Sequence, residues 1–295
     1  MSLLGQGLGF AVSEATLALF TSVAPSGTCA YLVLAALAMR HAPGSASRAA
    51  ADRLMVVPLA VVLTGLVSSA THLGSPANIL YVFSRIGSSP LSTEVFCTVM
   101  FLCMGGLYWL HSFALRRRPR LETAWLVLSV AAGGACIGSI ACAYQIPTIP
   151  TWNAPEHVLA QCLGALTGGL LLVACLLALT RPLPCKKAFL RLLVAFAAMA
   201  LTLGVVVLAL LQARVGALHN ALVSVQDLVP HYAHAVALYA LCGVVACLLV
   251  ASAMSQAPNT RPAARYGAAM ALMLVGTFSL RFVFYMSHLT VGPAF

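Results

Sequence analysis

The sequence predicts an all-α integral membrane protein: a bundle of eight transmembrane helices that forms a single domain over residues 1–295. Two observations predict this class. Of the residues, 61% are hydrophobic and 7% are charged, with a mean hydropathy of +0.98, whereas a soluble domain carries about 25% charged residues. The apolar residues also gather in segments of about 20, the length that a helix needs to cross the hydrocarbon core.

The eight apolar segments are rich in Leu, Ala and Val and contain single glycines, which membrane helices tolerate. Local signals mark some of their ends. Asp52 and Glu122 stand at helix starts, where an acid is favourable. Gly74 and Pro76 end the second segment, and Pro90 suits the start of the third. We expect spans at residues 14–39, 52–72, 91–115, 121–145, 156–180, 188–212, 232–254 and 264–288.

The cations are distributed unevenly along the chain. Thirteen of the 16 lie in or beside the first, third, fifth and seventh connections, and only Arg85, Arg214 and Arg281 lie toward the other side. The positive-inside rule then predicts that these connections are cytoplasmic and that both termini are extracytoplasmic. The net charge of +10 therefore indicates a lipid bilayer and no nucleic acid. The cluster at 116–120 serves either this topology or anionic lipid head groups.

The ten cysteines contain no C-x-x-C pair, and nine of them fall within the expected helices. Iron–sulfur clusters and structural zinc usually need closely spaced thiolates, so we expect neither in this chain. The first ten residues, MSLLGQGLGF, carry no basic region. We therefore expect no cleavable signal peptide.

Titratable side chains gather on the side opposite the cations. His72 ends the second span and Glu94 enters the third. Ionisable groups inside a membrane are costly, so each is a functional candidate, although an interfacial histidine and a helix-capping acid stay possible for these two. Arg281, Tyr285 and His288 share one helix face, and we expect an outer carboxylate to pair with Arg281.

The aromatic residues Tyr144 and Trp152, near the connection between the fourth and fifth spans, fit the ordinary interfacial belt. They would also suit a flat aromatic head group, but on their own they favour the belt. A quinol site needs hydrogen-bond acceptors for two hydroxyls, a proton acceptor and an apolar slot. The outer layer offers such a set. We expect quinol binding and proton transfer at His72, Glu94 and Arg85, supported by Ser75, Tyr232, Arg281, Tyr285 and His288.

Several motifs carry a family resemblance over essentially the whole chain. HLGSP at 72–76 is followed by RIGSSPLSTE at 85–94, PTW at 150–152, LVPHY at 228–232 and RFVFYMSHLTVG at 281–292. This order resembles the DmsC family, the membrane anchor subunit of dimethyl sulfoxide reductase-type molybdoenzyme complexes. The pattern departs little at these motifs; His231 stands where the family often has another polar residue.

The resemblance implies an anchor that is not catalytic on its own. It implies a four-cluster ferredoxin-like iron–sulfur subunit and a molybdopterin catalytic subunit as partners, in the cytoplasmic (inner) membrane of a prokaryote. It also implies that the anchor binds and oxidises menaquinol to menaquinone, without haem, and that His72 and Glu94 correspond to the family's quinol-site residues. The final acceptor stays open among dimethyl sulfoxide, other S- or N-oxides and selenate.

Three other functions compete with this one. A polysulfide reductase-type anchor has similar chemistry with a different helix pattern. A secondary transporter predicts charged groups or broken helices near the midplane, and most of the spans have apolar middles. A di-haem cytochrome b needs histidine pairs on facing helices, whereas the outer histidines lie at helix ends or in connections.

Overall fold

A computed structural model describes residues 3–71, 76–114, 118–180, 185–220, 223–255 and 263–290 of the chain. Within these residues, eight helical segments are long and apolar enough to cross a membrane, as the sequence predicts. They are α2 (Ala15–Met39), α3 with α4 (Ala46–Leu54 and Val56–Ala70), α5 (Pro90–His111), α6 (Pro119–Cys142), α7 (Pro155–Leu179), α8 (Lys187–Val215), α10 (Tyr232–Met254) and α11 (Ala263–Met286).

The helix bounds follow local signals in the sequence. Pro90, Pro119 and Pro155 each begin a helix, a position where the missing N–H of proline costs nothing. The second span begins six residues before the predicted residue 52, because Ser45 caps α3 by accepting a hydrogen bond from the Arg48 N–H at 3.2 Å. In the described ranges, three shorter helices lie outside the spans: α1 (Leu3–Ser13), η1 (Pro76–Arg85) and α9 (Val225–Leu228).

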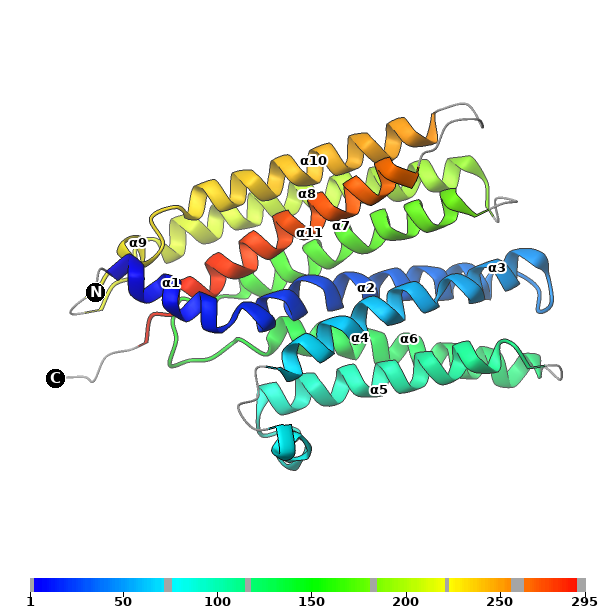
Figure 1. The fold of residues 1–295 in the computed structure, drawn as a ribbon, viewed down its shortest axis with the longest axis horizontal. Coiled ribbons are helices and arrows are strands. Elements are labelled where there is room, and N and C mark those ends of the chain that lie inside the picture. The colour runs from blue at the N-terminus through cyan, green and yellow to red at the C-terminus, as the bar shows by residue number, and fades with distance from the viewer. Residues whose placement is uncertain are drawn as a thin grey trace.

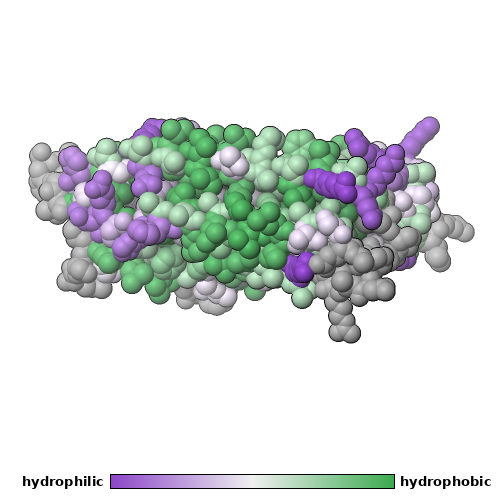
Figure 2. Space-filling view, turned by 90° about the horizontal axis from the view of Figure 1, so that it is seen from above, coloured by the Kyte–Doolittle hydropathy of each residue, from purple (hydrophilic) through white to green (hydrophobic). Residues whose placement is uncertain are grey.

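The spans run side by side, with α2 between two groups of helices (Figure 1). The helices α7, α8, α10 and α11 lie on one side of α2, and α4, α5 and α6 lie on the other. The helices α1, η1 and α9 gather at one end of the bundle, here named the α1 end, and α3 lies at the opposite α3 end. Hydrophobic side chains form a band between two ends that carry hydrophilic side chains (Figure 2).

Small residues let α2 approach its neighbours closely. A Cβ added to Gly169 of α7 would lie 2.6 Å from the Cβ of Cys29 on α2, and one added to Gly65 of α4 would lie 2.9 Å from Val23. Lipid is as apolar as the helix surfaces, so close packing of this kind is a main force that holds membrane helices together. These contacts make α2 the most buried of the spans, with 72% of its apolar window inside the structure.

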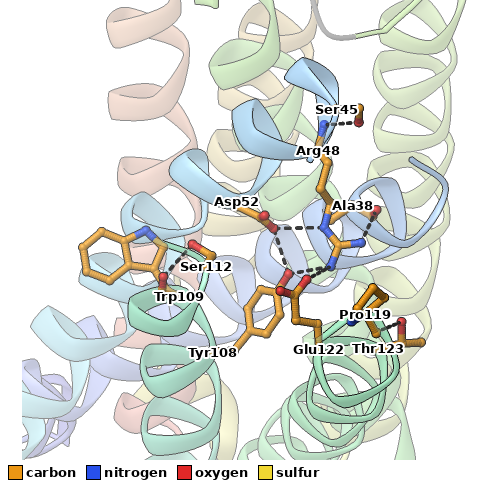
Figure 3. Close-up of polar contacts among 10 residues, drawn as sticks. All are labelled: Ala38, Ser45, Arg48, Asp52, Tyr108, Trp109, Ser112, Pro119, Glu122 and Thr123. Atoms are coloured by element: carbon orange, nitrogen blue, oxygen red, sulfur yellow. Dashed lines mark hydrogen bonds and ion pairs between the residues drawn. The ribbon is translucent and has the colours of Figure 1, made fainter. Parts of the chain in front are cut away.

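A cluster of buried charges ties helices together at the α3 end (Figure 3). Arg48 of α3 lies 3.3 Å from Asp52 Oδ1 and 4.0 Å from Glu122 Oε2 of α6. It also donates hydrogen bonds of 2.7 Å to Tyr108 of α5 and to the Ala38 carbonyl of α2.

The expectation that Asp52 and Glu122 are ordinary acids at helix starts is therefore wrong. They are 2% and 1% exposed, so they belong to the interior of the protein. Glu122 does lie in the first turn of α6, as the sequence predicts, whereas Asp52 is the seventh residue of α3. Their common partner Arg48 lies four residues before Asp52 and 74 before Glu122 in the sequence.

Candidate functional site

A pocket of about 550 Å³ opens at the α1 end of the bundle. Four parts of the chain that are distant in sequence form its wall: α1 with the start of α2, the start of α5, the segment between α6 and α7, and the end of α11. The volume falls within the range of about 300–1,000 Å³ that small-molecule sites occupy. The lining residues that carry polar or aromatic groups are Phe10, Glu14, Ser89, Glu94, Tyr144, Gln145, Trp152, Tyr285 and His288.

Glu94 is placed in this pocket by the start of α5. Ser89 caps the helix by accepting a hydrogen bond from the Ser92 N–H at 3.5 Å, and Pro90 occupies the first turn. Glu94 then falls on the buried face of α5 and is 0% exposed. Neither of its carboxylate oxygens has a hydrogen-bond partner among the described residues. A buried carboxylate without partners is energetically costly, so Glu94 is suited to receive a hydrogen bond or a proton from a ligand in the pocket.

Another part of the pocket wall is aromatic. The rings of Tyr144 and Trp152 meet edge to face at 5.8 Å, and Tyr285 contacts both rings at 5.6 and 5.8 Å. His288 stacks on Phe10 of α1 with ring centroids 4.3 Å apart. Flat apolar walls with a few polar groups are typical of sites for aromatic ligands.

Hydrogen bonds hold the segment between α6 and α7 against α11. Thr151 donates to the Ser287 carbonyl at 2.6 Å, and the Trp152 indole donates to the Phe284 carbonyl at 3.0 Å. Trp152 is only 5% exposed. The interpretation of this tryptophan as part of an interfacial belt is therefore wrong: its N–H is used inside the protein, and its ring forms the pocket wall.

The two tyrosine hydroxyls are oriented by one another. Tyr285 donates a 2.6 Å hydrogen bond to the hydroxyl oxygen of Tyr144. Burial, together with the neighbouring Tyr285, raises the pKa of Tyr144 well above its ordinary value of 10. Tyr144 therefore keeps its proton at neutral pH, and because its oxygen already accepts from Tyr285, that proton is free to be donated to another group.

Arg281 and Tyr232 belong to a second, smaller cavity of about 50 Å³ beside the first. His157, Gln161 and Tyr239 also line it. Among the described residues, no carboxylate lies within 4 Å of Arg281, although its charge interacts with that of the outer carboxylate Glu94 over a longer distance. Arg281 also lies 5.5 Å from the ring centroid of Phe284, a cation–π distance. Glu156, one of the candidate partners, instead pairs with Arg214 at 2.8 Å.

The structure thus brings together some of the residues that the sequence predicts. Glu94, Tyr285 and His288 line one pocket, and Arg281 with Tyr232 lines its neighbour. Arg85, the last residue of η1, is exposed and does not line the pocket. His72 and Ser75 lie outside the described residues.

Sequence reasoning considered an aromatic ligand beside Tyr144 and Trp152 but favoured the interfacial belt, and so left both residues out of the predicted site. One signal was present: three prolines, Pro147, Pro150 and Pro155, surround the tryptophan within a short connection. Proline restricts the backbone and removes hydrogen-bond donors. Such a connection is well suited to a fixed conformation over a helix end, whereas a lipid anchor needs no such restriction.

Comparison with known proteins identifies the family. The model of the family described as DMSO reductase anchor subunit (DmsC) matches residues 8–286. The sequence is 31% identical over 234 residues to the anaerobic dimethyl sulfoxide reductase chain YnfH of Escherichia coli, and the match covers 78% of this sequence and 79% of that protein.

Two further relatives are C subunits of anaerobic dimethyl sulfoxide reductase. The one from Escherichia coli is 31% identical over 78% of this sequence and 79% of its own length. The one from Haemophilus influenzae is 28% identical over 95% of this sequence and 96% of its own length. The eight apolar helices agree with these matches, and the protein belongs to the DMSO reductase anchor subunit (DmsC) family.

Proposed function

We propose that this protein is the menaquinol-oxidising anchor of an anaerobic respiratory dimethyl sulfoxide reductase-type complex in the inner membrane of a prokaryote. It takes electrons from menaquinol and passes them to a four-cluster iron–sulfur subunit, which supplies a molybdopterin subunit that reduces the final acceptor. One observation carries the proposal: a buried carboxylate without hydrogen-bond partners among the described residues, Glu94, lies in the wall of an aromatic pocket of about 550 Å³.

The pocket fits the head group of a quinol. That head group is flat, which suits the rings of Tyr144, Trp152 and Tyr285. It also carries two hydroxyl groups that need partners. Glu94 offers two unused acceptor oxygens, and Tyr144 offers a hydroxyl whose oxygen is already engaged by Tyr285. An anchor that only held its partners at the membrane would need no such acceptor and donor in the wall of one apolar pocket.

Each residue then has a defined role. Glu94 accepts a proton from one hydroxyl as a general base. Tyr144 donates a hydrogen bond that holds the ring in place, and His288 closes the pocket by stacking on Phe10. His72, through the family resemblance, accepts a hydrogen bond from the second hydroxyl. We place Arg85 at the exposed surface beside the start of α5, where it faces a docked partner and does not contact the quinol.

The membrane orientation follows from charge. Among the described residues, the helix ends that carry the cations of the first, third, fifth and seventh connections, such as Arg40, Arg120 and Lys187, lie at the α3 end. The positive-inside rule makes that end cytoplasmic. The α1 end with its pocket is then extracytoplasmic. The iron–sulfur subunit docks at this end, because electrons pass efficiently only over short distances and the quinol gives up its electrons there.

The test is the binding and oxidation of a menaquinol analogue by membranes that carry the assembled complex. The variants are Glu94→Gln and His72→Leu, and the matched control is Glu156→Gln, which removes an outer carboxylate that pairs with Arg214 outside the pocket. We expect Glu94→Gln and His72→Leu to lose quinol oxidation while the complex stays assembled, and Glu156→Gln to behave as the wild type. Unchanged turnover in Glu94→Gln would show that the quinol site lies elsewhere.

A further inference from the structure

A line of buried polar side chains runs from the Glu94 pocket toward the opposite end of the bundle. It begins on α5, whose buried face carries the polar residues Glu94, Thr98 and Tyr108, with Phe101 and Gly105 between the last two. These positions are spaced by three or four residues or by multiples of a turn, so they lie one above another along the helix. Tyr108 belongs to the charged cluster at the α3 end, so this single helix face joins the two ends.

The outer part of the line is a contact of three helices. Thr98 of α5 lies 3.5 Å from the sulfur of Cys136 on α6, and Thr28 of α2 lies 3.7 Å from the same sulfur. All three residues are 0% exposed. Thr98 is also one turn from Glu94, whose carbonyl accepts its hydrogen bond at 2.9 Å. This bond joins Thr98 to the backbone of Glu94, one turn inward from the carboxylate, whose oxygens make no hydrogen bond among the described residues.

The middle of the line is Tyr31 of α2, one turn beyond Thr28. It is 0% exposed, and its hydroxyl has no hydrogen bond among the described residues, although Ser129 of α6 lies near it. A Cβ added to Gly105 would lie 3.2 Å from the Cζ that bears this hydroxyl. The hydroxyl therefore reaches the level of Gly105, one turn before Tyr108. An unsatisfied hydroxyl at this depth destabilises the fold, which favours a functional reason for its presence.

The inner part of the line is the Arg48 cluster at the α3 end (Figure 3). Tyr108 donates a 2.8 Å hydrogen bond to Asp52 and accepts one of 2.7 Å from Arg48. Glu122 completes the cluster from α6. The line thus has carboxylates at both ends and hydroxyl and thiol groups between them. Buried acidic residues in membrane-spanning helices often belong to proton relays, and here hydroxyl groups stand between two such sites.

We propose that this line conducts protons between Glu94 and the Arg48 cluster, so that the protein divides the protons of its substrate between the two faces of the membrane. The inference rests on the proposed function. Oxidation of one quinol releases two electrons, which go to the iron–sulfur partner, and two protons. The Glu94 carboxylate takes up one proton and passes it inward by way of Thr98 and Tyr31.

Each hydroxyl accepts one proton and releases another, so no side chain changes its net state during a turnover. Between groups that are more than a hydrogen bond apart, a water molecule bridges the step. The proton leaves through the carboxylates of the cluster to water at the α3 end, and Glu94 returns to its charged form. The second proton leaves through the mouth of the pocket at the α1 end.

The test measures where protons appear. The complex is inserted into preformed vesicles that contain a pH-indicating dye, with its soluble partners outside, so that the α3 end faces the lumen. A menaquinol analogue is then oxidised with an impermeant acceptor that takes up electrons without protons. We expect the wild type to acidify the lumen. In Tyr31→Phe and Thr98→Val, luminal acidification should fall severalfold, while the total number of protons released per quinol stays the same.

These variants suit the test because they preserve packing. Tyr31→Phe removes only a hydroxyl that makes no hydrogen bond among the described residues, and Thr98→Val keeps the shape of the side chain. The matched controls are Tyr81→Phe, on an exposed part of η1, and Thr202→Val, an exposed threonine of α8 with the same bond to the carbonyl four residues before it, at 3.0 Å. Both controls should acidify the lumen like the wild type.

Two results would overturn the proposal. One is a wild type that oxidises quinol without acidifying the lumen. The other is wild-type acidification in both Tyr31→Phe and Thr98→Val. If the proposed function itself were wrong, the result would be different: Glu94→Gln would still oxidise quinol, irrespective of where the protons appear.

Discussion

Gly169 is the position where a single methyl group tests the helix packing most directly. In Gly169→Ala, the new Cβ would lie 2.6 Å from Cys29 Cβ, 2.8 Å from Cys29 Sγ and 2.9 Å from the Ser26 carbonyl oxygen. Carbon atoms in contact are about 3.5–4.0 Å apart, so the overlap is about 1 Å. A backbone oxygen and a Cβ cannot rotate away, and α2 and α7 must therefore separate.

Overpacking of this kind costs about 1–3 kcal/mol, whereas replacing glycine by alanine in a helix contributes about 1 kcal/mol in the opposite direction. Gly134→Ala on α6 provides the control, because no atom lies within 4 Å of its added Cβ. The difference between the two variants isolates the clash, and we expect Gly169→Ala to be less stable than Gly134→Ala by about 1–3 kcal/mol.

The ten cysteines are free, and several are buried, including Cys29 and Cys175. Thermal unfolding in detergent can therefore be followed with a dye that becomes fluorescent on reaction with thiols. If Gly169→Ala unfolds at the same temperature as Gly134→Ala or above it, the close approach of α2 and α7 described above is wrong.

Replacing Arg48 with methionine should lower the free energy of unfolding by about 3–5 kcal/mol, because Asp52 stays buried without the guanidinium beside it. Replacing the exposed Arg53 with methionine should change the free energy of unfolding little. Equal stability of the two variants in the thiol assay would contradict this prediction. Burial lowers the pKa of His288 below its ordinary value of 6.5, so the unfolded chain takes up a proton before the folded chain does as the pH falls. Stability should therefore decrease as the pH falls through 6.5 and level off below the folded pKa, and His288→Gln should make that decrease smaller; identical pH profiles of the unfolding temperature would refute the role of this histidine. Tyr144→Phe should weaken binding of a menaquinol analogue by about fivefold to tenfold, the value of one hydrogen bond of about 1 kcal/mol. Tyr232→Phe, in the neighbouring cavity, should leave the dissociation constant unchanged. Equal dissociation constants for the two variants would show that Tyr144 does not belong to the site.

The helices could be predicted from the sequence because their signals are local. Apolar length, prolines at helix starts and the placement of cations depend on neighbouring residues, and the eight spans appear where these signals place them. Glu94 could be predicted for the same reason, since Pro90 and Ser92 fix its distance from the start of α5.

The residues that surround Glu94 could not be predicted in this way. Trp152 enters the pocket wall through its bond to the Phe284 carbonyl, 132 residues away in sequence. The same is true at the α3 end, where Arg48 and Glu122 lie 4.0 Å apart although 74 residues separate them in the sequence. Such contacts depend on which helices become neighbours, and hydrophobic periodicity does not specify this. Aromatic and acidic residues near a helix end look the same in sequence whether they face lipid, water or a pocket.

The central position of α2 has a consequence for how the protein is made. This helix leaves the ribosome before the other spans, yet 72% of its apolar window is buried against partners that are synthesised later, whereas the corresponding share for α8 is 33%. Its mean hydropathy of 1.6 is also well below the 2.7 of α8. Until α5 and the later helices arrive, the buried face of α2 lacks the side chains that cover it, such as Phe101 of α5 against Tyr31 and Cys136 of α6 against Thr28. Newly made α2 must therefore wait beside the insertion machinery, and a polypeptide that stops before α11 would be a natural target for membrane proteases.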